Sequence, residues 1–546
     1  MSPGVIPMLR ALTFACLLLA VPVLGVLGSW LAIDAGAVAV LRHQVQTVLP
    51  DYAANSLWLV LIVGLGVAGV GGVTAALVTL FDFPLRRFFE WALLLPLAMP
   101  AYVLAYAATD FLQFSGPLQT GLRTLTGAQG ALWPDVRSLG GAAVLFVLCL
   151  YPYVYLLTRT ALSERGVQLM EAARLLGAGT GRRVREVALP LARPAIAAGV
   201  ALALMETLAD YGVTSYFGLQ TFTTGIYQAW LVMNDHTAAA QLASVLLLVV
   251  AVVLWLERRA QKRMRFAVAR NAVVSGNEAR PLRLIGTPAV LALLACALPV
   301  LLGFALPVAV LLRLLWQEAQ GGHIGLPLAR FAQWAWTSFK LASLAAVLAV
   351  LIALCLGFAL RTQTNRPLRW ATRVVSLGYA VPGAVIAVGI LLPVGWLQMR
   401  FPQLGASVLM TGTLFGLMYA YLVRFSSVAL QSVEAGYTRV PASIDETARM
   451  LGVSRRRMFT RLHAPLLKRA SLAALLLVFV DVMKELPATL VLRPFNSDTL
   501  AVVAYQLARD ERLGEAALPS LAIVLVGLLP VMLLSRAMRP LSMNRV

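Results

Sequence analysis

The stretch Glu171-Ala-Ala-Arg-Leu-Leu-Gly177 returns later in the chain as Glu446-Thr-Ala-Arg-Met-Leu-Gly452. Each copy leads to a proline, in Ala188-Leu-Pro190 and in His463-Ala-Pro465. The glutamate, the glycine and the proline are each displaced by 275 residues, so three anchors share one offset without a gap. A match of this kind indicates that the chain is a tandem duplication.

Long apolar segments occupy most of the 546-residue chain. The composition is 60% hydrophobic and only 13% charged, which is too apolar for a soluble protein of this length. A membrane helix needs about 20 mostly apolar residues, and stretches of that length recur from end to end. We therefore predict an all-α polytopic membrane protein with about twelve transmembrane helices. They are expected at residues 10–32, 56–80, 91–113, 139–158, 194–212, 238–256, 288–312, 338–360, 374–397, 405–428, 470–490 and 517–535.

The duplication agrees with the spans, because each repeated stretch follows the fourth span of a six-span half. We predict a first half over residues 1–256, a polar cytoplasmic linker over 257–286 and a second half over 287–546. The repeated loops extend over about 159–193 and about 429–469. Six spans return the chain to its starting side of the membrane. The halves are therefore expected to form a parallel repeat, related by an axis along the membrane normal.

The formal net charge of +21 has to be reconciled with a membrane assignment. If the N-terminus is cytoplasmic, most of the 45 Lys and Arg fall in cytoplasmic segments, as the positive-inside rule requires. The segment from Ala209 to Thr237, which is predicted to lie outside, contains none. We therefore expect both termini in the cytoplasm. We expect no binding of nucleic acid, since no soluble domain could present a basic face.

The first apolar stretch has an alternative interpretation as a cleaved signal peptide. Arg10 precedes it, and small residues lie near Gly28 and Ser29. Cleavage would leave an odd number of spans and upset the charge asymmetry, so a retained helix is the better interpretation.

The sequence lacks the motifs of an enzyme or of a metal site. Four cysteines, Cys16, Cys149, Cys296 and Cys355, lie singly in apolar spans, without disulfide or metal spacing. A phosphate-binding P-loop needs Gly-Lys followed by Ser or Thr, and no lysine in this chain follows a glycine. We therefore expect a chain that is not an enzyme and binds no cofactor or resident metal.

The repeated loops have the pattern of a helix-turn-helix on the cytoplasmic face. Gly177 and Gly452 suit the C′ position, where a left-handed backbone ends a helix, and Ser454 can cap a second short helix. The loop could simply pack beneath its own bundle, but two copies of one surface loop suit two copies of a partner. Apolar residues recur at helical spacing in both loops: Leu169, Ala172, Ala173 and Leu176, and then Ile444, Thr447, Ala448 and Leu451.

At these residues the chain resembles the permeases of binding-protein-dependent ABC importers. The spacing of Glu-Ala-Ala, Gly and Leu-Pro carries the resemblance, although the second copy has Thr447 and Ala464 where the pattern has Ala and Leu. The resemblance implies that each loop, here called the first and the second docking loop, holds a coupling helix that seats in a cleft of a separate ATPase. The docking residues that it implies are Glu171, Ala172, Gly177, Pro190, Glu446, Ala448, Gly452 and Pro465.

The same resemblance implies partners and a location. It implies two copies of the ATPase subunit, which uses ATP and Mg, together with a periplasmic binding protein and a bacterial inner membrane. The alternative class is an ion-coupled transporter of the major facilitator type. Its charged signature should lie between the second and third spans, where this chain has only the short Asp82-Phe-Pro-Leu-Arg86-Arg87 without the expected glycines.

Segments that follow the docking loops resemble fused permeases for ferric iron. The resemblance implies that a periplasmic receptor delivers Fe³⁺ and that ATP binding and release rock the two halves. Thiamine permeases share the fused layout, so they remain an alternative, as do permeases for sulfate, phosphonate and polyamines. The matching stretches are residues 205–212, 221–230, 483–490 and 493–496.

Four acidic residues lie in predicted spans. Glu206 and Asp210 are four apart and share one helix face, and the offset of 275 carries them onto Asp481 and Glu485. Ionisable groups cost about 2.5 to 3.5 kcal/mol each in a membrane segment, so they usually face a bundle interior or a wet path. Because hard oxygen ligands suit Fe³⁺, we predict that the four carboxylates line the translocation path. Alternatively, Glu485 pairs with Lys484 or another cation, or the four lie in water at the outer membrane edge.

In each half, one aromatic segment follows the fifth span. They are residues 216–230 and 495–506, and Tyr227-Gln228 in the first recurs as Tyr505-Gln506 in the second. We expect them to shape the outer gate or the receptor-facing surface. Alternatively, their aromatic side chains only anchor the bundle at the membrane interface. Exposure of Thr223 and Asn496 distinguishes the two interpretations.

Overall fold

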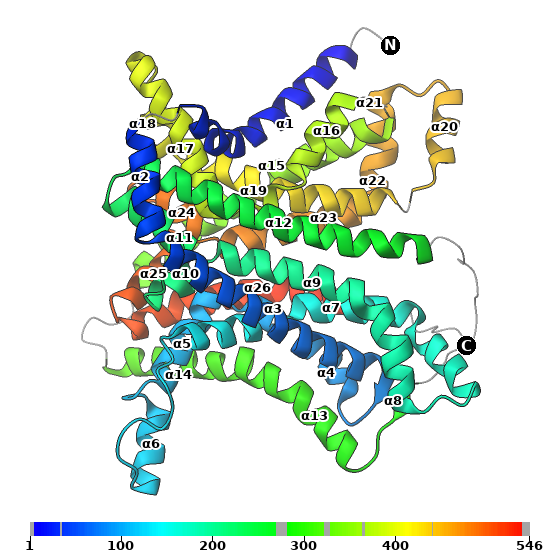
Figure 1. Ribbon diagram of the computed structural model, residues 1–546. Helices are drawn as coiled ribbons and strands as arrows, with labels where there is room; N and C mark the ends of the chain where they lie inside the picture. The colour runs from blue at the N-terminus through cyan, green and yellow to red at the C-terminus, as the bar shows by residue number, and fades with distance from the viewer. Residues whose placement is uncertain are drawn as a thin grey trace. The chain divides into compact units, whose positions relative to one another are not determined.

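The computed structural model describes residues 5–32, 35–268, 281–321, 328–362, 366–438 and 440–537 (Figure 1). Residues 269–280 of the predicted linker lie outside the described residues. Nearly all of the described chain is helical. The strands β1 (Phe81–Asp82) and β2 (Leu282–Arg283) form one short parallel pair. The predicted all-α class is confirmed.

The helices alternate long and short along both halves of the sequence. The first half holds α1 (Val5–Gly28), α2 (Ala35–Gln46), α3 (Leu49–Leu80), α4 (Arg86–Ala92), α5 (Ala101–Leu112), α6 (Pro117–Thr126), α7 (Leu139–Leu175), α8 (Thr180–Arg183), α9 (Leu189–Ala209), α10 (Gly212–Tyr216), α11 (Phe222–Tyr227) and α12 (His236–Val268). The second half holds α13 (Thr287–Val300), α14 (Leu306–Gly321), α15 (Leu328–Thr362), α16 (Arg366–Val375), α17 (Gly383–Arg400), α18 (Ala406–Thr411), α19 (Leu414–Tyr437), α20 (Ala442–Met450), α21 (Arg455–Arg457), α22 (Ala464–Leu466), α23 (Lys468–Met483), α24 (Pro487–Leu492), α25 (Leu500–Arg509) and α26 (Leu513–Ala537).

Ten helices in the described residues are long and apolar enough to cross a membrane. An eleventh candidate is a pair of segments, 86–98 and 101–126, bent by 93°. The bend falls at Pro100, which has no amide hydrogen to continue a helix. The predicted span at 470–490 is shorter than expected, because α23 has 16 residues and ends at Met483, shortly before Pro487. The polytopic architecture is therefore confirmed, with ten or eleven candidate spans instead of about twelve.

The chain forms two compact units, and each unit draws on both halves of the sequence. Unit 1 comprises residues 1–46, 225–247 and 327–503, and unit 2 comprises 47–224, 248–326 and 504–546. These units differ in composition from the two sequence halves that the repeat predicts. The division into two halves remains a prediction about duplication within the sequence.

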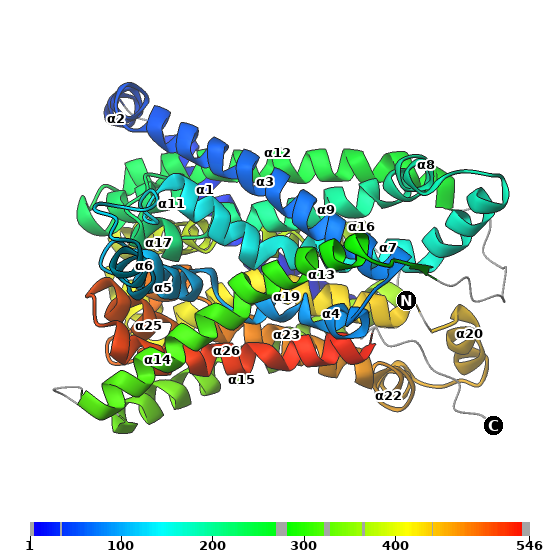
Figure 2. The same ribbon diagram turned by 90° about the horizontal axis from the view of Figure 1, so that it is seen from below.

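Equivalent helices form the core of each unit. In unit 2, α3, α7 and α9 pack against one another, and in unit 1, α15, α19 and α23 do the same (Figure 1; Figure 2). Each core also receives a helix from the other sequence half. Helix α1 packs on α17 in unit 1, and α14 packs on α5 in unit 2.

Glycines allow close approach in the core of unit 2. A Cβ atom on Gly71 of α3 would lie 2.7 Å from the carbonyl oxygen of Tyr151 on α7. A Cβ atom on Gly199 of α9 would lie 2.5 Å from the Cα atom of Val154, also on α7. Small residues are typical where membrane helices approach closely. Helix α7, which continues into the first docking loop, is therefore tightly held on two sides.

Candidate functional site

The first docking loop begins as an uninterrupted extension of a membrane helix. Helix α7 has 37 residues and ends at Leu175, so the predicted fourth span and the loop helix are one element. Gly177 has a φ of +80°, and its amide donates to the carbonyl of Arg174. The amide of Ala178 donates to the carbonyl of Ala173, which completes a Schellman motif.

The second docking loop ends its first helix in the same way. Helix α20 is separate from α19, because Pro441 stands at its N-cap. Gly452 has a φ of +68° and donates to Arg449, and Val453 donates to Ala448. The predicted left-handed conformation of both glycines is therefore confirmed. Ser454 lies at the N-cap of α21, but its side chain makes no capping hydrogen bond.

Each docking loop returns toward the membrane through a π-helical turn just before the repeated proline. The turns are Val184–Ala188 before Pro190 and Met458–His463 before Pro465. A proline ring crowds the carbonyl four residues earlier and offers no amide hydrogen, and a widened turn relieves that crowding. The two prolines therefore lie within continuous helical paths without a sharp break.

The tip of each docking loop carries large exposed apolar side chains. Leu175 and Leu176 are 81% and 88% exposed, and their counterparts Met450 and Leu451 are 89% and 76% exposed. An apolar patch on an otherwise charged loop is typical of an interaction surface. Sequence reasoning missed Leu175 and Met450, because they lie outside the helical stripe on which it relied.

The predicted docking residues differ in exposure. Glu171 is partly exposed and lies 3.5 Å from Arg174, while Ala172 and Glu446 are exposed. Ala448 is buried and packs in an apolar cluster with Met458. Their docking function remains a prediction.

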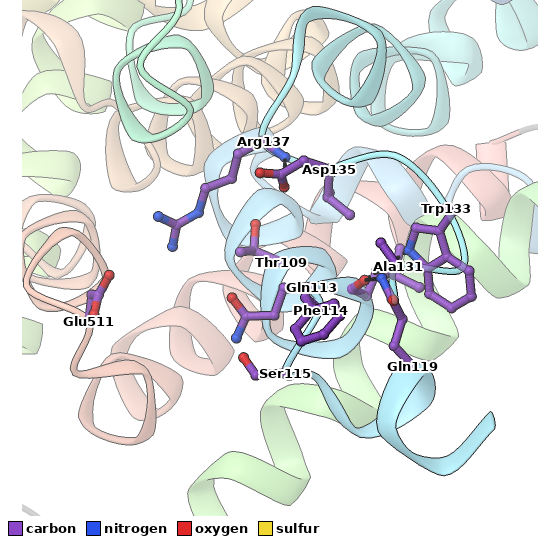
Figure 3. Close-up of a pocket in the computed structure, with 12 residues that line it drawn as sticks. Thr109, Gln113, Phe114, Ser115, Gln119, Ala131, Trp133, Asp135, Arg137 and Glu511 are labelled. Atoms are coloured by element: carbon purple, nitrogen blue, oxygen red, sulfur yellow. Dashed lines mark hydrogen bonds between the residues drawn. The ribbon is translucent and has the colours of Figure 1, made fainter. Parts of the chain in front are cut away.

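A cavity of about 330 Å³ with a mixed polar and apolar lining lies in unit 2 (Figure 3). Gln113 at the end of α5, Asp135 and Arg137 before α7, and Glu511 after α25 contribute to its lining. The guanidinium of Arg137 donates to the hydroxyl of Tyr216 at 3.2 Å. Sequence reasoning missed this cavity, because its residues come from loops that no repeat connects.

The aromatic segments contact short helices that follow the docking loops. The hydroxyl of Tyr227 donates to the carbonyl of Pro487 at the start of α24, within unit 1. The hydroxyl of Tyr505 lies 2.8 Å from Oγ of Ser215 on α10, within unit 2. Each tyrosine therefore contacts the helix supplied by the other sequence half. Thr223 is buried and Asn496 is exposed. Only the second segment therefore has the exposure that we expected of an outer surface.

Two of the four predicted path carboxylates cap short helices. Oδ1 of Asp210 accepts hydrogen bonds from the amides of Val213 at 2.9 Å and Thr214 at 3.3 Å, at the start of α10. Glu485 accepts from the amides of Ala488 and Thr489, 275 residues further on. A carboxylate at this position satisfies amides that the helix leaves unpaired.

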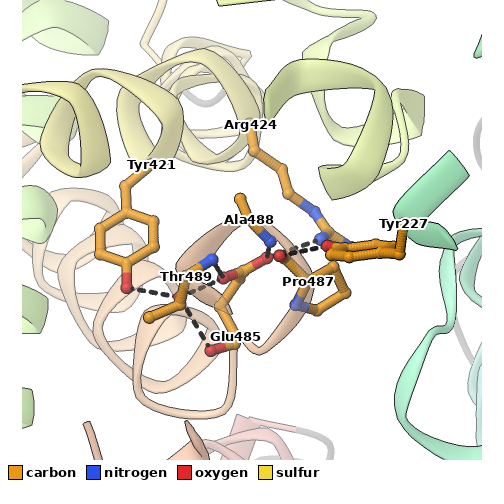
Figure 4. A network of polar contacts seen from close by, with 7 residues as sticks. All are labelled: Tyr227, Tyr421, Arg424, Glu485, Pro487, Ala488 and Thr489. Atoms are coloured by element: carbon orange, nitrogen blue, oxygen red, sulfur yellow. Dashed lines mark hydrogen bonds and ion pairs between the residues drawn. The ribbon is translucent and has the colours of Figure 1, made fainter. Parts of the chain in front are cut away.

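Glu485 lies in a buried polar network within unit 1 (Figure 4). Its Oε1 lies 3.4 Å from a guanidinium nitrogen of Arg424, and its Oε2 accepts a hydrogen bond from Oγ1 of Thr489. The hydroxyl of Tyr421 lies 2.8 Å from Oγ1 of Thr489. Glu485 therefore pairs with a cation, as the alternative interpretation expects, and that cation is Arg424. Lys484 lies 3.0 Å from Asp481.

Two of the four carboxylates lie in each unit, Glu206 and Asp210 in unit 2 and Asp481 and Glu485 in unit 1. Among the described residues, no group of three or more His, Cys, Asp or Glu is placed to hold a metal ion. Glu206 is partly buried one turn before the end of α9. A function of the four carboxylates in the path remains a prediction.

Comparison with known proteins identifies two copies of one domain. The family described as binding-protein-dependent transport system inner membrane component matches residues 68–266 and 351–542. The Fe(3+)-transport system permease protein FbpB 2 of Haemophilus influenzae is 25% identical over 495 residues, 89% of this chain and 90% of that protein. The putative 2-aminoethylphosphonate permease PhnV of Salmonella typhimurium is 29% identical over 36% of this chain and 71% of its own length. The molybdenum permease ModB of Escherichia coli is 27% identical over 35% of this chain and 91% of its own length.

Proposed function

Because the chain belongs to the family of binding-protein-dependent transport system inner membrane components, we propose that it is the membrane channel through which an ATP-driven importer carries ferric iron. Membership of this family means that the chain is a multi-pass inner membrane permease and a transport component of an ABC importer. One observation supports iron as the cargo. The relative that aligns along 89% of this chain, and so across both copies of the domain, is a Fe(3+)-transport permease.

Two relatives with other cargoes align over a shorter length. The phosphonate and molybdenum permeases match 36% and 35% of this chain, a length that corresponds to one copy of the domain. Their similarity supports the domain, whereas the similarity to the iron permease extends to the fused arrangement. The iron proposal therefore rests on the fused layout together with the cargo of that relative.

In this proposal each docking loop seats one copy of a separate ATPase, which uses ATP and Mg. The exposed pairs Leu175-Leu176 and Met450-Leu451 become buried in that contact. Helix α7 transmits the movement of the first loop directly, because a single helix runs from the loop into the core of unit 2. A periplasmic binding protein delivers iron at the other face, both termini lie in the cytoplasm, and the chain itself binds no cofactor.

The test is uptake into proteoliposomes that contain the permease, its ATPase and its binding protein. We expect accumulation of ferric iron that requires ATP and the binding protein, and none with an ATPase that cannot hydrolyse ATP. Parallel assays use 2-aminoethylphosphonate, molybdate and thiamine. Uptake of one of these solutes without uptake of iron would show that the proposed cargo is wrong, and the assignment as an importer would stand.

A further inference from the structure

The two docking loops are anchored by different chemistry at positions that the duplication makes equivalent. Beneath the first loop, five buried side chains form an apolar cluster in unit 2. It contains one residue from α3, two from α7 and two from the segment that returns to the membrane: Leu80, Leu162, Met170, Ala188 and Ala192. None of these five side chains carries a titratable group.

Beneath the second loop, three of the five equivalent positions are polar. The offset of 275 carries Leu162, Met170 and Ala188 onto Tyr437, Asp445 and His463. Asp445 on α20 is 5% exposed and His463 is 0% exposed, so both are buried. An aspartate and a histidine thus occupy sites that are filled by a methionine and an alanine in the other copy.

An arginine at the end of α15 completes the polar anchor. Nε of Arg361 donates to Oδ2 of Asp445 at 2.7 Å, and its Nη2 donates to the carbonyl of Val440 at 2.8 Å. Oδ1 of Asp445 lies 3.1 Å from Nε2 of His463. A single guanidinium therefore joins α15 both to α20 and to the chain that precedes α20.

The surroundings of His463 make this anchor sensitive to protons. Its ring lies edge-on to Phe358 at 5.1 Å and near the ring of Tyr437 at 5.6 Å. The charged and titratable groups around it are Asp445, Arg361 and Tyr437. Burial lowers the pKa of His463, Asp445 opposes the shift and Arg361 adds to it. A proton on this imidazole would place a second buried cation beside Arg361, with one carboxylate to compensate both.

We propose that Arg361, Asp445 and His463 form a positioning centre that holds the second docking helix against α15. Both loops rest on apolar clusters, and the second loop alone adds this buried charged centre. Acid weakens the attachment of the second loop and leaves that of the first unchanged. The inference rests on the proposed function only in treating the loops as ATPase-docking elements, and it holds for any cargo.

Two reporter cysteines test this difference in the complete permease–ATPase complex. Met170→Cys reports on the first anchor and Met458→Cys on the second, since both methionines are buried. The background carries Cys355→Ser, because Cys355 is exposed whereas Cys16, Cys149 and Cys296 are buried. The rate of maleimide alkylation is measured from pH 7.5 to pH 5.5. The ratio of the Met458→Cys rate to the Met170→Cys rate cancels the ordinary effect of pH on thiol ionisation.

We expect this ratio to rise as the pH falls below about 6.5, by at most about tenfold per pH unit, and to level off once the buried imidazole of His463 is itself protonated. In His463→Gln, whose side chain cannot take up a proton, we expect the ratio to stay constant. A constant ratio in the parent, or an equal rise in His463→Gln, would overturn the proposal.

A second variant covers the case in which His463→Gln does not assemble. Asp445→Asn removes the charge that compensates Arg361, so we expect faster alkylation of Met458→Cys at every pH and no change at Met170→Cys. Parental alkylation rates in Asp445→Asn would also overturn the proposal. Iron does not enter this readout, so absence of iron uptake refutes only the proposed cargo, and a constant ratio refutes only the positioning centre.

Discussion

Asp210 and Glu485, 275 residues apart, make the same capping contact: each carboxylate accepts a 2.9 Å hydrogen bond from the amide three residues later. Both residues were expected on the face of a membrane helix. Instead, Asp210 is the C-cap of α9, in an extended conformation, and Glu485 follows the end of α23 at Met483. The offset identified equivalent residues correctly. Because the helices end earlier than expected, these residues cap the next helix and do not lie on a helix face.

Replacement of Glu485 tests the buried network. In Glu485→Gln the guanidinium of Arg424 loses its buried carboxylate, and removal of one partner from a buried pair costs about 3–5 kcal/mol. We expect a clearly lower midpoint of thermal unfolding for the purified permease. The matched control is Glu186→Gln, whose exposed pair with Arg182 contributes at most about 1 kcal/mol. Equal midpoints for the two variants would contradict a stabilising function of Glu485.

Transport assays test the carboxylates in the path. Glu206→Gln and Asp481→Asn leave both helix caps intact, so we expect normal assembly with the ATPase and slower iron uptake. Asp210→Asn and Glu485→Gln are expected to affect assembly as well, because a neutral amide removes the negative charge that stabilises the start of the short helix. Parental iron uptake by all four assembled variants would show that these carboxylates do not line the path.

The two positive-φ glycines test how the docking loops are shaped. Nothing lies within 4 Å of a Cβ atom built on Gly177 or Gly452, so alanine there is strained by its backbone conformation and meets no clash. The left-handed conformation costs about 1–2 kcal/mol for a residue with a Cβ. We expect Gly177→Ala and Gly452→Ala to weaken binding of the ATPase several-fold in a pull-down titration.

Gly179→Ala is the matched control for both glycines. Gly179 lies two residues from Gly177, also has open space around its Cβ position, and has an ordinary φ of −64°. Binding of the ATPase by Gly179→Ala should equal that of the parent. Equal weakening by all three alanine variants would mean that the backbone conformation is not the cause.

The sequence predicted features that depend on a few local residues. A gap-free offset located both docking loops, and the two glycines correctly marked where the loop helices end. The continuity of α7 and the break before α20 were not predicted, because helical periodicity does not report whether two adjacent helices join.

Contacts between residues far apart in the sequence were not predicted. Met170 and Asp445 are the buried anchors of the docking loops, yet they lie one position outside the apolar stripe. The composition of the two units also depends on which helices pack together, and hydropathy alone does not specify that. Both misses concern residues whose partners lie far away in the sequence.

The exposed apolar tips give a direct test of docking. Burying a leucine side chain stabilises a contact by about 1.5–3 kcal/mol, so a serine at one tip should weaken the ATPase complex by tenfold or more. We expect this result for Leu176→Ser and for Leu451→Ser, measured as the dissociation constant of the purified complex. Leu125→Ser on α6 is the control, because Leu125 is similarly exposed outside the docking loops. A control that binds as weakly as the two tip variants would contradict a specific docking surface.

The buried imidazole of His463 predicts how stability depends on pH. Its pKa in the folded chain is lowered from the ordinary value of 6.5, chiefly by burial, so the unfolded chain binds more protons just below that pH. The corresponding stability is complete above about pH 6.5 and is lost as the pH falls through the lowered value. We therefore expect the unfolding midpoint of the parent to fall more steeply than that of His463→Gln between pH 7 and pH 5. Carboxylates that titrate in the same range affect both proteins alike, so the difference between the two midpoints isolates His463. A difference that does not vary with pH, or that widens as the solution becomes alkaline, would show that His463 is not held as a buried neutral group.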